Sequence, residues 1–299
     1  MASQKSAKEE SYVFDRNHAA TSRLNYQYYL WQNAAGFYLH PDIPQLQPNA
    51  QVADVATGSG MWLLDLASSL PPTTRLTGLD ISLAQCPPRA WLPHNVQLFS
   101  WDFFTEVPVD LVAKFDVVHI RLVAVTIRNN DPTVLVRNLA RLLKPGGFLQ
   151  WDELDTPTAH VTVAAPNLET EALEQLRELL ISPMKGRNGE TLLGSRDWIQ
   201  AIPENLETNG FCDVRKHTYC EAPHMGVFWN DVISPIVWTF TANGGRWVLS
   251  AEEFADVMLK TDDTVKEKQL RSMALRASKE SDAGAAVRYG KMSIIARKL

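Results

Sequence analysis

The sequence predicts an α/β protein built on a Rossmann-like, doubly wound, mostly parallel sheet. Short apolar segments of strand character alternate with helical segments over residues 50–155. Prolines, glycines and acidic residues separate these segments. The chain has 299 residues, of which 45% are hydrophobic, so it can bury one large core. Strands that alternate with helices are typical of a parallel sheet with helices on its faces.

The first four strands are expected before residue 121. Residues 52–55 form a short buried strand, and residues 61–70 form a helix that stops at the prolines that follow it. A second strand is expected at residues 75–79 and a third at residues 96–99. The fourth strand, residues 115–120, is the richest in β-branched side chains.

A further helix and a fifth strand complete this part of the chain. Asp131 supplies an N-cap, and Pro132 fits the first helical position. One face of the helix carries Leu135, Leu139 and Leu142. The sequence KPGG at residues 144–147 then ends the helix and leads into a strand at residues 148–151.

The alternation changes after residue 151. Helices are predicted at residues 166–182 and 195–209, and strands that extend the sheet at residues 210–218 and 291–299. The segment 222–280 is predicted to be mostly helical and is rich in aromatic residues, namely Phe228, Trp229, Trp238, Phe240, Trp247 and Phe254.

The expected organisation is one sheet with a composite helical lid. Residues 1–45 form an N-terminal lid segment, residues 46–155 form the ligand-binding core, and residues 156–299 add the last strands and the substrate cap. The helical cover over the ligand-binding edge is expected from residues 11–45, 156–200 and 222–280.

Composition excludes several classes of function. The net charge of −5 and a pI near 5.8 give no general attraction for nucleic acid or anionic membranes. The three cysteines form no CxxC pair, which argues against a zinc site or a disulfide framework. No apolar run approaches the length of a membrane helix, and the first residues are polar. These observations predict a cytoplasmic protein without nucleic-acid or membrane partners.

The segment VADVATGSGMW, residues 52–62, is the most informative stretch. In an open parallel sheet, ligands bind beyond the carboxyl ends of the strands where the strand order reverses, and this turn would lie there. Small residues let the backbone approach a ligand closely. Asp54 ends the strand, and an acid at this point suits a ligand with a cationic end, such as the ammonium of an amino acid.

Two more acids follow the next two strands. Asp80, in LTGLDIS, can accept both hydroxyls of a ribose. Asp102, in FSWDFF, can accept a hydrogen bond from an adenine amino group while the aromatic neighbours Trp101 and Phe103 enclose the ring. Each acid taken alone is more often a turn cap or a solvated side chain. Their conjunction indicates an amino acid, a ribose and an adenine, and therefore S-adenosylmethionine.

These stretches, together with FDVVHIRLV and LARLLKPGGFLQWDE, resemble the successive motifs of class I S-adenosylmethionine-dependent methyltransferases over residues 50–153. The N-terminal YVFDRNHAATSRLNYQYYLW resembles the small methyltransferases of fungal secondary-metabolite clusters. The resemblance implies a seven-stranded sheet whose final strand, residues 291–299, is antiparallel. Ala56 stands where the family usually has its first glycine. The cofactor-binding residues implied are Asp54, Ala56, Thr57, Gly58, Gly60, Asp80, Ile81, Trp101, Asp102, Phe103 and Arg121.

Catalytic residues are less clearly indicated. His119, at the end of the fourth strand, could accept a proton from a substrate, or it could be a core histidine satisfied by a hydrogen bond. Histidines of the predicted lid could serve instead, namely His18, His40, His160 and His224. The acids Asp131, Asp152 and Glu153 could suggest a metal, but a helix cap and a strand end explain them, so no metal site is predicted.

The sequence therefore predicts a methyltransferase that acts on an O or N atom of a small-molecule acceptor. An enzyme that uses bound S-adenosylmethionine in a cyclisation or rearrangement would carry the same motifs. A methyltransferase-like regulatory protein is the third alternative.

Overall fold

The computed structural model describes residues 16, 18–127, 129–182, 184–185, 191–193, 197–219, 221–230, 232 and 263–299. A seven-stranded sheet runs through this part of the chain in the order β3-β2-β1-β4-β5-β9-β8. Its strands are β1 Gln51–Val55, β2 Arg75–Asp80, β3 Val96–Ser100, β4 Phe115–Arg121, β5 Leu143–Val163, β8 Phe211–Tyr219 and β9 Ala285–Lys298. A separate two-stranded sheet pairs β6 Met184–Lys185 with β7 Thr191–Leu193.

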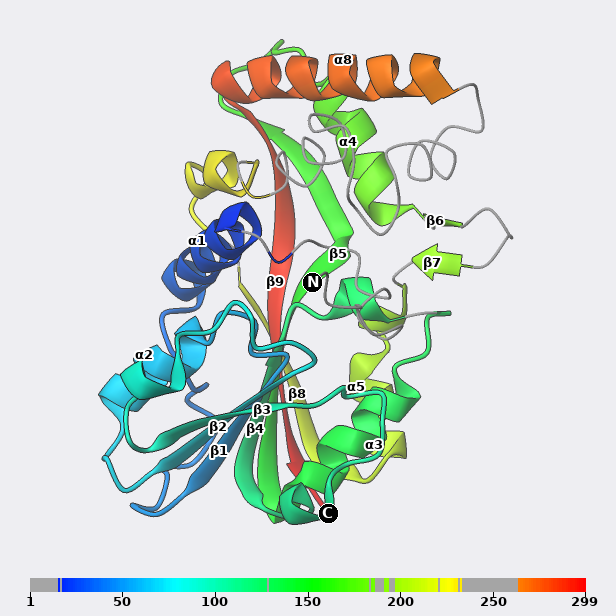
Figure 1. Ribbon diagram of the computed structural model, residues 1–299. Coiled ribbons are helices and arrows are strands. Elements are labelled where there is room, and N and C mark those ends of the chain that lie inside the picture. The colour runs from blue at the N-terminus through cyan, green and yellow to red at the C-terminus, as the bar shows by residue number, and fades with distance from the viewer. Residues whose placement is uncertain are drawn as a thin grey trace.

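The helices lie between and above these strands (Figure 1). The α-helices are α1 His18–Ala35, α2 Met61–Ser69, α3 Thr133–Leu142, α4 Glu171–Ile181, α5 Ile202–Thr208 and α8 Asp263–Asp282. Residues 225–230 are also helical. Short 3₁₀ helices are η2 Arg89–Trp91, η3 Val109–Leu111, η4 Ala124–Thr126 and η5 Asp197–Ile199. None of the helices in the described ranges is long and apolar enough to cross a membrane.

The sheet has the predicted topology. Strands β3, β2, β1, β4 and β5 are parallel to their neighbours, and β9 is antiparallel to both β5 and β8. This confirms the doubly wound sheet with an antiparallel final strand. The chain proceeds from β1 to β3 on one side and continues at β4 on the other, so the strand order reverses between β1 and β4. Ligands of open α/β sheets bind at this point, beyond the carboxyl ends of the strands.

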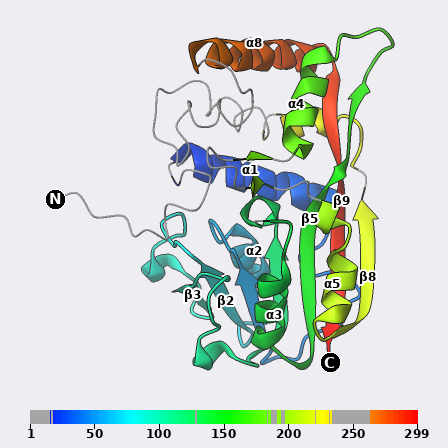
Figure 2. The same cartoon turned by 90° about the vertical axis from the view of Figure 1, so that its right-hand side faces the viewer.

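Each face of the sheet packs against its own helices (Figure 1), and Figure 2 shows the side that carries α3 and α5. Val52 and Val117 lie in one apolar cluster with Trp62 of α2. Their neighbours Ala53 and Val118 face the other way, into the cluster that also holds α3 and α5. Successive strand residues alternate between faces, so Asp54 and His119 point to the α2 side.

β5 is much longer than predicted. The predicted strand covered residues 148–151, and residues 156–200 were expected to be helical cover. In the structure β5 continues to Val163, paired with β9 past a shift of register between Asp155 and His160. Residues 156–163 are therefore strand, because the antiparallel β9 continues beside them and supplies a hydrogen-bonding partner beyond the parallel sheet. This extended pair reaches α4 and α8 (Figure 1).

Other boundaries differ by smaller amounts. α3 begins at Thr133, with Pro132 at its N-cap, and Asp131 accepts the Thr133 amide at 2.9 Å. The helix predicted at 166–182 spans Glu171–Ile181, and the one predicted at 195–209 is divided between η5 and α5. In 222–280, residues 225–230 and α8 are helical. Trp238, Phe240, Trp247 and Phe254 lie outside the described residues.

Candidate cofactor-binding site

The loop between β1 and α2 turns sharply at three residues with positive φ. Ala56 has φ 57°, Gly58 has φ 58° and Gly60 has φ 79°. This region costs a residue with a Cβ about 1–2 kcal/mol, which explains why glycine is usual where Ala56 stands. Gly60 is also the N-cap of α2, and its amide donates to the Thr57 carbonyl at 2.9 Å. The loop is thus held in one conformation at the start of a helix.

Asp80 fixes this loop to the neighbouring strand. One carboxylate oxygen of Asp80 accepts the Gly58 amide at 2.9 Å, and the other accepts the Ser82 amide at 3.1 Å. Burial raises the pKa of Asp80, although both amides act in the opposite direction. A carboxylate has about four acceptor sites, so Asp80 can still accept the two hydroxyls of a ribose.

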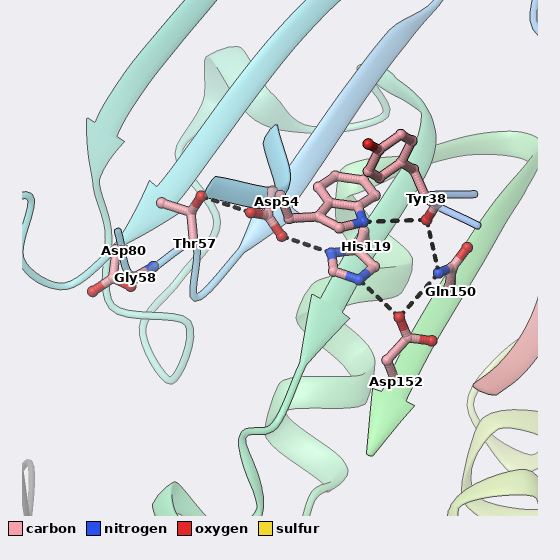
Figure 3. A network of polar contacts seen from close by, with 9 residues as sticks. Tyr38, Asp54, Thr57, Gly58, Asp80, His119, Gln150 and Asp152 are labelled. Atoms are coloured by element: carbon pink, nitrogen blue, oxygen red, sulfur yellow. Dashed lines mark hydrogen bonds and ion pairs between the residues drawn. The ribbon is translucent and has the colours of Figure 1, made fainter. Parts of the chain in front are cut away.

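Three buried side chains from neighbouring strands form an ion cluster beside the loop, which we call the loop cluster (Figure 3). His119 Nδ1 lies 2.7 Å from Asp54 Oδ1, and His119 Nε2 lies 3.1 Å from Asp152 Oδ2. None of the three side chains is more than 5% exposed. Asp54 is paired with His119 in the register of β1 and β4, so both point to the same face. The second Asp54 oxygen accepts the Thr57 hydroxyl at 2.6 Å, which joins the cluster to the loop.

The loop cluster holds a cation between two anions. Burial alone would lower the pKa of His119, but the hydrogen bonds and charges of Asp152 and Asp54 outweigh it, and the pKa is raised. Burial would raise the pKa of Asp152, but His119, Arg121 and Ser293 reverse this effect and lower it. With a carboxylate oxygen at each ring nitrogen, the geometry also fits an imidazolium that donates to Asp54 and to Asp152.

His119 has no ring nitrogen left for a substrate. Both nitrogens bond to carboxylates, and the ring stacks on Trp62 with centroids 3.8 Å apart and planes 9° apart. An imidazolium donates at both nitrogens and accepts at neither. Of the two interpretations of His119, this geometry favours the histidine satisfied within the core.

Arg121 ends β4 with a guanidinium that is not fully paired. Its Nη1 is buried and has no hydrogen-bond partner among the described residues, while the guanidinium lies 5.0 Å from the centre of the Tyr28 ring. Burial lowers the pKa of Arg121, although the charges of Asp152 and Asp54 act against this. A buried donor without a partner is costly, and an anionic group of a ligand would satisfy it.

α1 lies against the loop through polar and apolar side chains. Asn25 accepts the Ser59 hydroxyl at 2.6 Å, and the Leu24 side chain lies 3.7 Å from where a Cβ on Gly58 would stand. Tyr28 donates to Asp65 of α2 at 2.6 Å. One face of α1 is thereby placed above the carboxyl end of β1.

The residues expected around adenine lie at the end of β3. Asp102 Oδ1 accepts the Phe104 amide at 3.0 Å in a local turn. Trp101 is buried in the core and donates to the Glu106 carbonyl at 3.2 Å. Phe103 and Ile81 are partly buried. The structure brings Ile81 close to this turn, because its carbonyl accepts a hydroxyl from Ser100, the last residue of β3.

The other histidines lie elsewhere. His18, His160 and His224 are exposed. His40 is the one among the four that is buried, and it lies near Asp42 and His217 with candidate ligand atoms within 4.8 Å.

This is the one group of possible metal ligands in the described part of the chain, and one possible ligand atom of each residue is already engaged. His40 Nδ1 accepts the Asp42 amide at 3.0 Å. Asp42 Oδ2 bonds His217 Nε2 at 3.0 Å and Arg215 Nη1 at 3.2 Å. The positive charge of the Arg215 guanidinium at the Asp42 carboxylate would repel a metal cation.

Sequence reasoning missed several residues of this site. Gln150, Tyr28, Trp62 and Asn25 were not singled out, and Asp152 was interpreted as an acid at a strand end. Gln150 and Asp152 alternate on β5 and so share the face that carries His119, a period-2 signal that was available. No comparable pattern in the sequence indicated the contacts of Asn25 and Tyr28 in α1.

Comparison with known proteins agrees with this geometry. The family described as "Methyltransferase domain" matches residues 53–149. Methyltransferase grgD of Penicillium sp is 37% identical over 142 residues, which cover 42% of this chain and 49% of grgD. N-methyltransferase verN of Clonostachys rogersoniana is 30% identical over 158 residues, covering 53% of this chain and 54% of verN. N-methyltransferase tcpN of Claviceps purpurea is 33% identical over 140 residues, covering 46% of this chain and 50% of tcpN.

The chain thus spans about half the length of the curated relatives it matches. The matched region runs from β1 into β5 and includes the β1–α2 loop, Asp80 and Arg121. Its strand order and the reversal between β1 and β4 are those expected of the same family. Residues 53–149 are therefore a class I S-adenosylmethionine-dependent methyltransferase domain, and the chain is related to methyltransferases of fungal secondary-metabolite clusters.

Proposed function

We propose that this chain transfers the methyl group of S-adenosylmethionine to a nitrogen atom of a small, largely apolar acceptor. The buried Nη1 of Arg121, which has no partner at the reversal of strand order, is the observation that carries the proposal. It supplies a donor for the methionyl carboxylate beside a loop whose residues suit the rest of the cofactor. Several relatives named N-methyltransferase support nitrogen as the acceptor atom.

The cofactor would contact residues from three strand ends. Arg121 Nη1 would donate to its carboxylate, and Asp54 would accept from its ammonium directly or through water. The loop residues Ala56, Thr57, Gly58 and Gly60 would line its methionine part. Asp80 and Ile81 would hold the ribose, and Trp101, Asp102 and Phe103 the adenine.

S-adenosylmethionine, when bound, supplies a methyl group on a sulfonium, which is an activated leaving group. The chain then has to align the acceptor and exclude water, and alignment alone can contribute about 7–11 kcal/mol. A neutral amine needs no strong base. The absence of a free lone pair on His119 supports an acceptor of this kind over a phenol.

The acceptor would lie against the apolar side of α1. Leu122, directly after Arg121, packs with Leu154, Trp31 and Trp229. In the described part of the chain, the indole nitrogens of Trp31 and Trp229 are buried without hydrogen-bond partners, as is Glu221 Oε1. These groups would accept an apolar molecule that carries both N–H and carbonyl groups.

Incubation with methyl-labelled S-adenosylmethionine and candidate amines, with matched hydroxyl compounds as controls, tests the proposal. A product heavier by one CH₂, formed with release of S-adenosylhomocysteine from amines but not hydroxyl compounds, supports it. An isomerised substrate with the cofactor unspent supports a rearrangement instead. Methyl transfer to oxygen alone contradicts the nitrogen assignment but not the methyltransferase activity.

A further inference from the structure

Gln150 of β5 occupies the centre of a polar network that the proposed chemistry does not use. It is fully buried, and each of its polar atoms is engaged. Its Oε1 accepts the His40 amide at 2.8 Å. Its Nε2 donates to the Tyr38 carbonyl at 3.2 Å and to Asp152 Oδ2 at 3.0 Å (Figure 3). One side chain thus binds both the N-terminal segment and the loop cluster.

The N-terminal segment at residues 36–40 is tied to the sheet at a second point. Trp62 Nε1 donates to the same Tyr38 carbonyl at 3.1 Å, and the Trp62 ring stacks on His119. Two side chains from different elements therefore converge on one carbonyl, and both also contact the loop cluster. Displacement of this segment would leave Gln150 and Trp62 with unsatisfied buried donors.

The path from this segment to the β1–α2 loop is continuous. Gln150 and His119 share Asp152 Oδ2 as acceptor, His119 bonds Asp54, and Asp54 accepts the Thr57 hydroxyl. Every link is buried, so water cannot readily replace a lost bond. A displacement of residues 36–40 should therefore shift the β1–α2 loop, and a change in the loop should likewise shift residues 36–40.

We propose that Gln150 is a positioning residue that couples the seating of residues 36–40 to the conformation of the β1–α2 loop, so that cofactor binding and closure of the N-terminal segment favour each other. This inference rests on the proposed function, because it assumes that the loop binds the cofactor. Linkage requires that each event strengthen the other by the same factor.

Gln150→Glu is the variant that distinguishes this role from simple packing. The shape is kept, and one oxygen can still accept the His40 amide, but an ionised glutamate cannot donate to Asp152 or Tyr38. A protonated glutamate can donate to one of them. The titratable or charged groups around this position are Asp152, His119, Arg121 and His40, with Asp54 and Tyr219 beyond them.

The matched control is Asn230→Asp. Asn230 is also a buried bridging amide, and it donates to Ser281 and the Ala285 carbonyl and accepts the Val287 amide. Its bonds join the helix at 225–230 to α8 and β9, and none of them reaches a residue of the loop cluster. This variant reproduces the change from amide to acid in a different network.

The experiment is calorimetric titration with S-adenosylhomocysteine at pH 6.0, 7.0 and 8.5. We expect Gln150→Glu to bind about tenfold more weakly than wild type at pH 8.5, with the deficit shrinking towards pH 6. Asn230→Asp should keep the wild-type affinity at every pH. A Gln150→Glu affinity equal to wild type, or a deficit independent of pH, overturns the inference. No binding by wild type would instead overturn the proposed function, and the inference with it.

Hydrogen exchange of the wild-type protein gives a second test that needs no variant. The His40 amide donates to Gln150, so its exchange rate reports whether residues 36–40 are seated. Bound S-adenosylhomocysteine should slow this exchange, and the factor should be about the coupling factor between seating of the segment and ligand binding. Unchanged exchange at His40 upon ligand saturation overturns the coupling even if Gln150→Glu does not fold.

Discussion

Two buried charged clusters lie on the same sheet and differ in how fully they are paired. In the loop cluster, the nitrogens of His119 and the carboxylates of Asp54 and Asp152 all have partners. The second, which we call the cover cluster, consists of Glu221, Trp229 and Lys291. Glu221 Oε2 bonds Lys291, whose ammonium lies 4.3 Å from the centre of the Trp229 ring. Glu221 Oε1 and the Trp229 indole nitrogen have no hydrogen-bond partner within the ranges that the structure describes.

This difference in pairing suggests different roles, because a fully paired cluster can position neighbouring segments whereas an incompletely paired one can bind a ligand. A buried network with every member satisfied rigidifies the structure around it, whereas an unsatisfied buried group remains costly until another molecule pairs with it. Arg121, whose Nη1 is unpaired in the described part of the chain, interacts with the charges of Asp152 and Asp54 and directly precedes Leu122, which packs in the apolar cluster of Trp229. We therefore propose that the loop cluster is part of the scaffold of the cofactor site and that the cover cluster lies on the acceptor side.

The largest expected effect is a loss of stability when the loop cluster is disrupted. His119→Ala leaves two buried carboxylates facing each other and should lower the free energy of unfolding by about 3–5 kcal/mol. The control is His160→Ala, because His160 is exposed on the same sheet. Denaturant unfolding at pH 7 measures both. Equal losses for the two variants would show that the loop cluster adds no stability.

The next effect concerns Glu153, which accepts backbone amides rather than a cation. Burial raises its pKa to about 7, although the amides of Leu154, Val123 and Ala124 lower it in part. The folded protein therefore holds a proton that the unfolded chain releases from about pH 4.5 upward. This contribution to stability is present at low pH and is lost as pH rises towards 7.

Glu153→Gln removes that dependence. Relative to wild type, its free energy of unfolding should increase by about 2 kcal/mol between pH 5 and pH 8. Urea unfolding of both proteins across this range measures the difference. A difference that stays constant with pH would mean that Glu153 titrates in the folded protein as it does in water.

Two tryptophans compare the clusters directly. Trp62 and Trp229 are both buried, but the Trp62 indole donates to Tyr38 whereas the Trp229 indole has no partner. Trp62→Phe leaves the Tyr38 carbonyl with one donor fewer. We therefore expect it to lower the free energy of unfolding by about 1–2 kcal/mol more than Trp229→Phe does. Thermal and denaturant unfolding of the pair provide the measurement. A larger loss for Trp229→Phe would reverse the distinction between the clusters.

The smallest effect is expected at the loop itself. Ala56→Gly relieves a positive φ but gives the unfolded chain more freedom, so the free energy of unfolding should change by less than about 1 kcal/mol. Cofactor affinity should stay within about threefold, since no side-chain contact of the loop cluster is lost. A loss of stability above 2 kcal/mol would show that the Ala56 methyl group packs in a way that offsets its strain.

Local patterns predicted much of the fold. The short apolar runs at β1, β2, β3 and β4 gave the strands within a residue, since each is bounded by turn residues. The acids at three strand ends likewise directed attention to the edge of the sheet where the strand order reverses. Both inferences depend on neighbours in sequence.

The rest depends on pairing between distant segments. β5 beyond Trp151 contains polar residues and a proline, and it is a strand because β9 lies beside it. The bonds of His119 join residues 65 and 33 positions away, so neither its charge nor its lack of a free nitrogen could be read from FDVVHIRLV. Asp152 gained its role in the same way.

The central claim is that the edge formed by β1, β2 and β4 binds S-adenosylmethionine through Asp80 and its neighbours. Calorimetric titration of S-adenosylhomocysteine into wild type, Asp80→Ala and the exposed control Asp110→Ala tests it most directly. The account predicts that Asp80→Ala binds at least about tenfold more weakly, because the ribose loses its acceptors and the Gly58 amide its partner, while Asp110→Ala matches wild type. Equal affinity of all three proteins would contradict it.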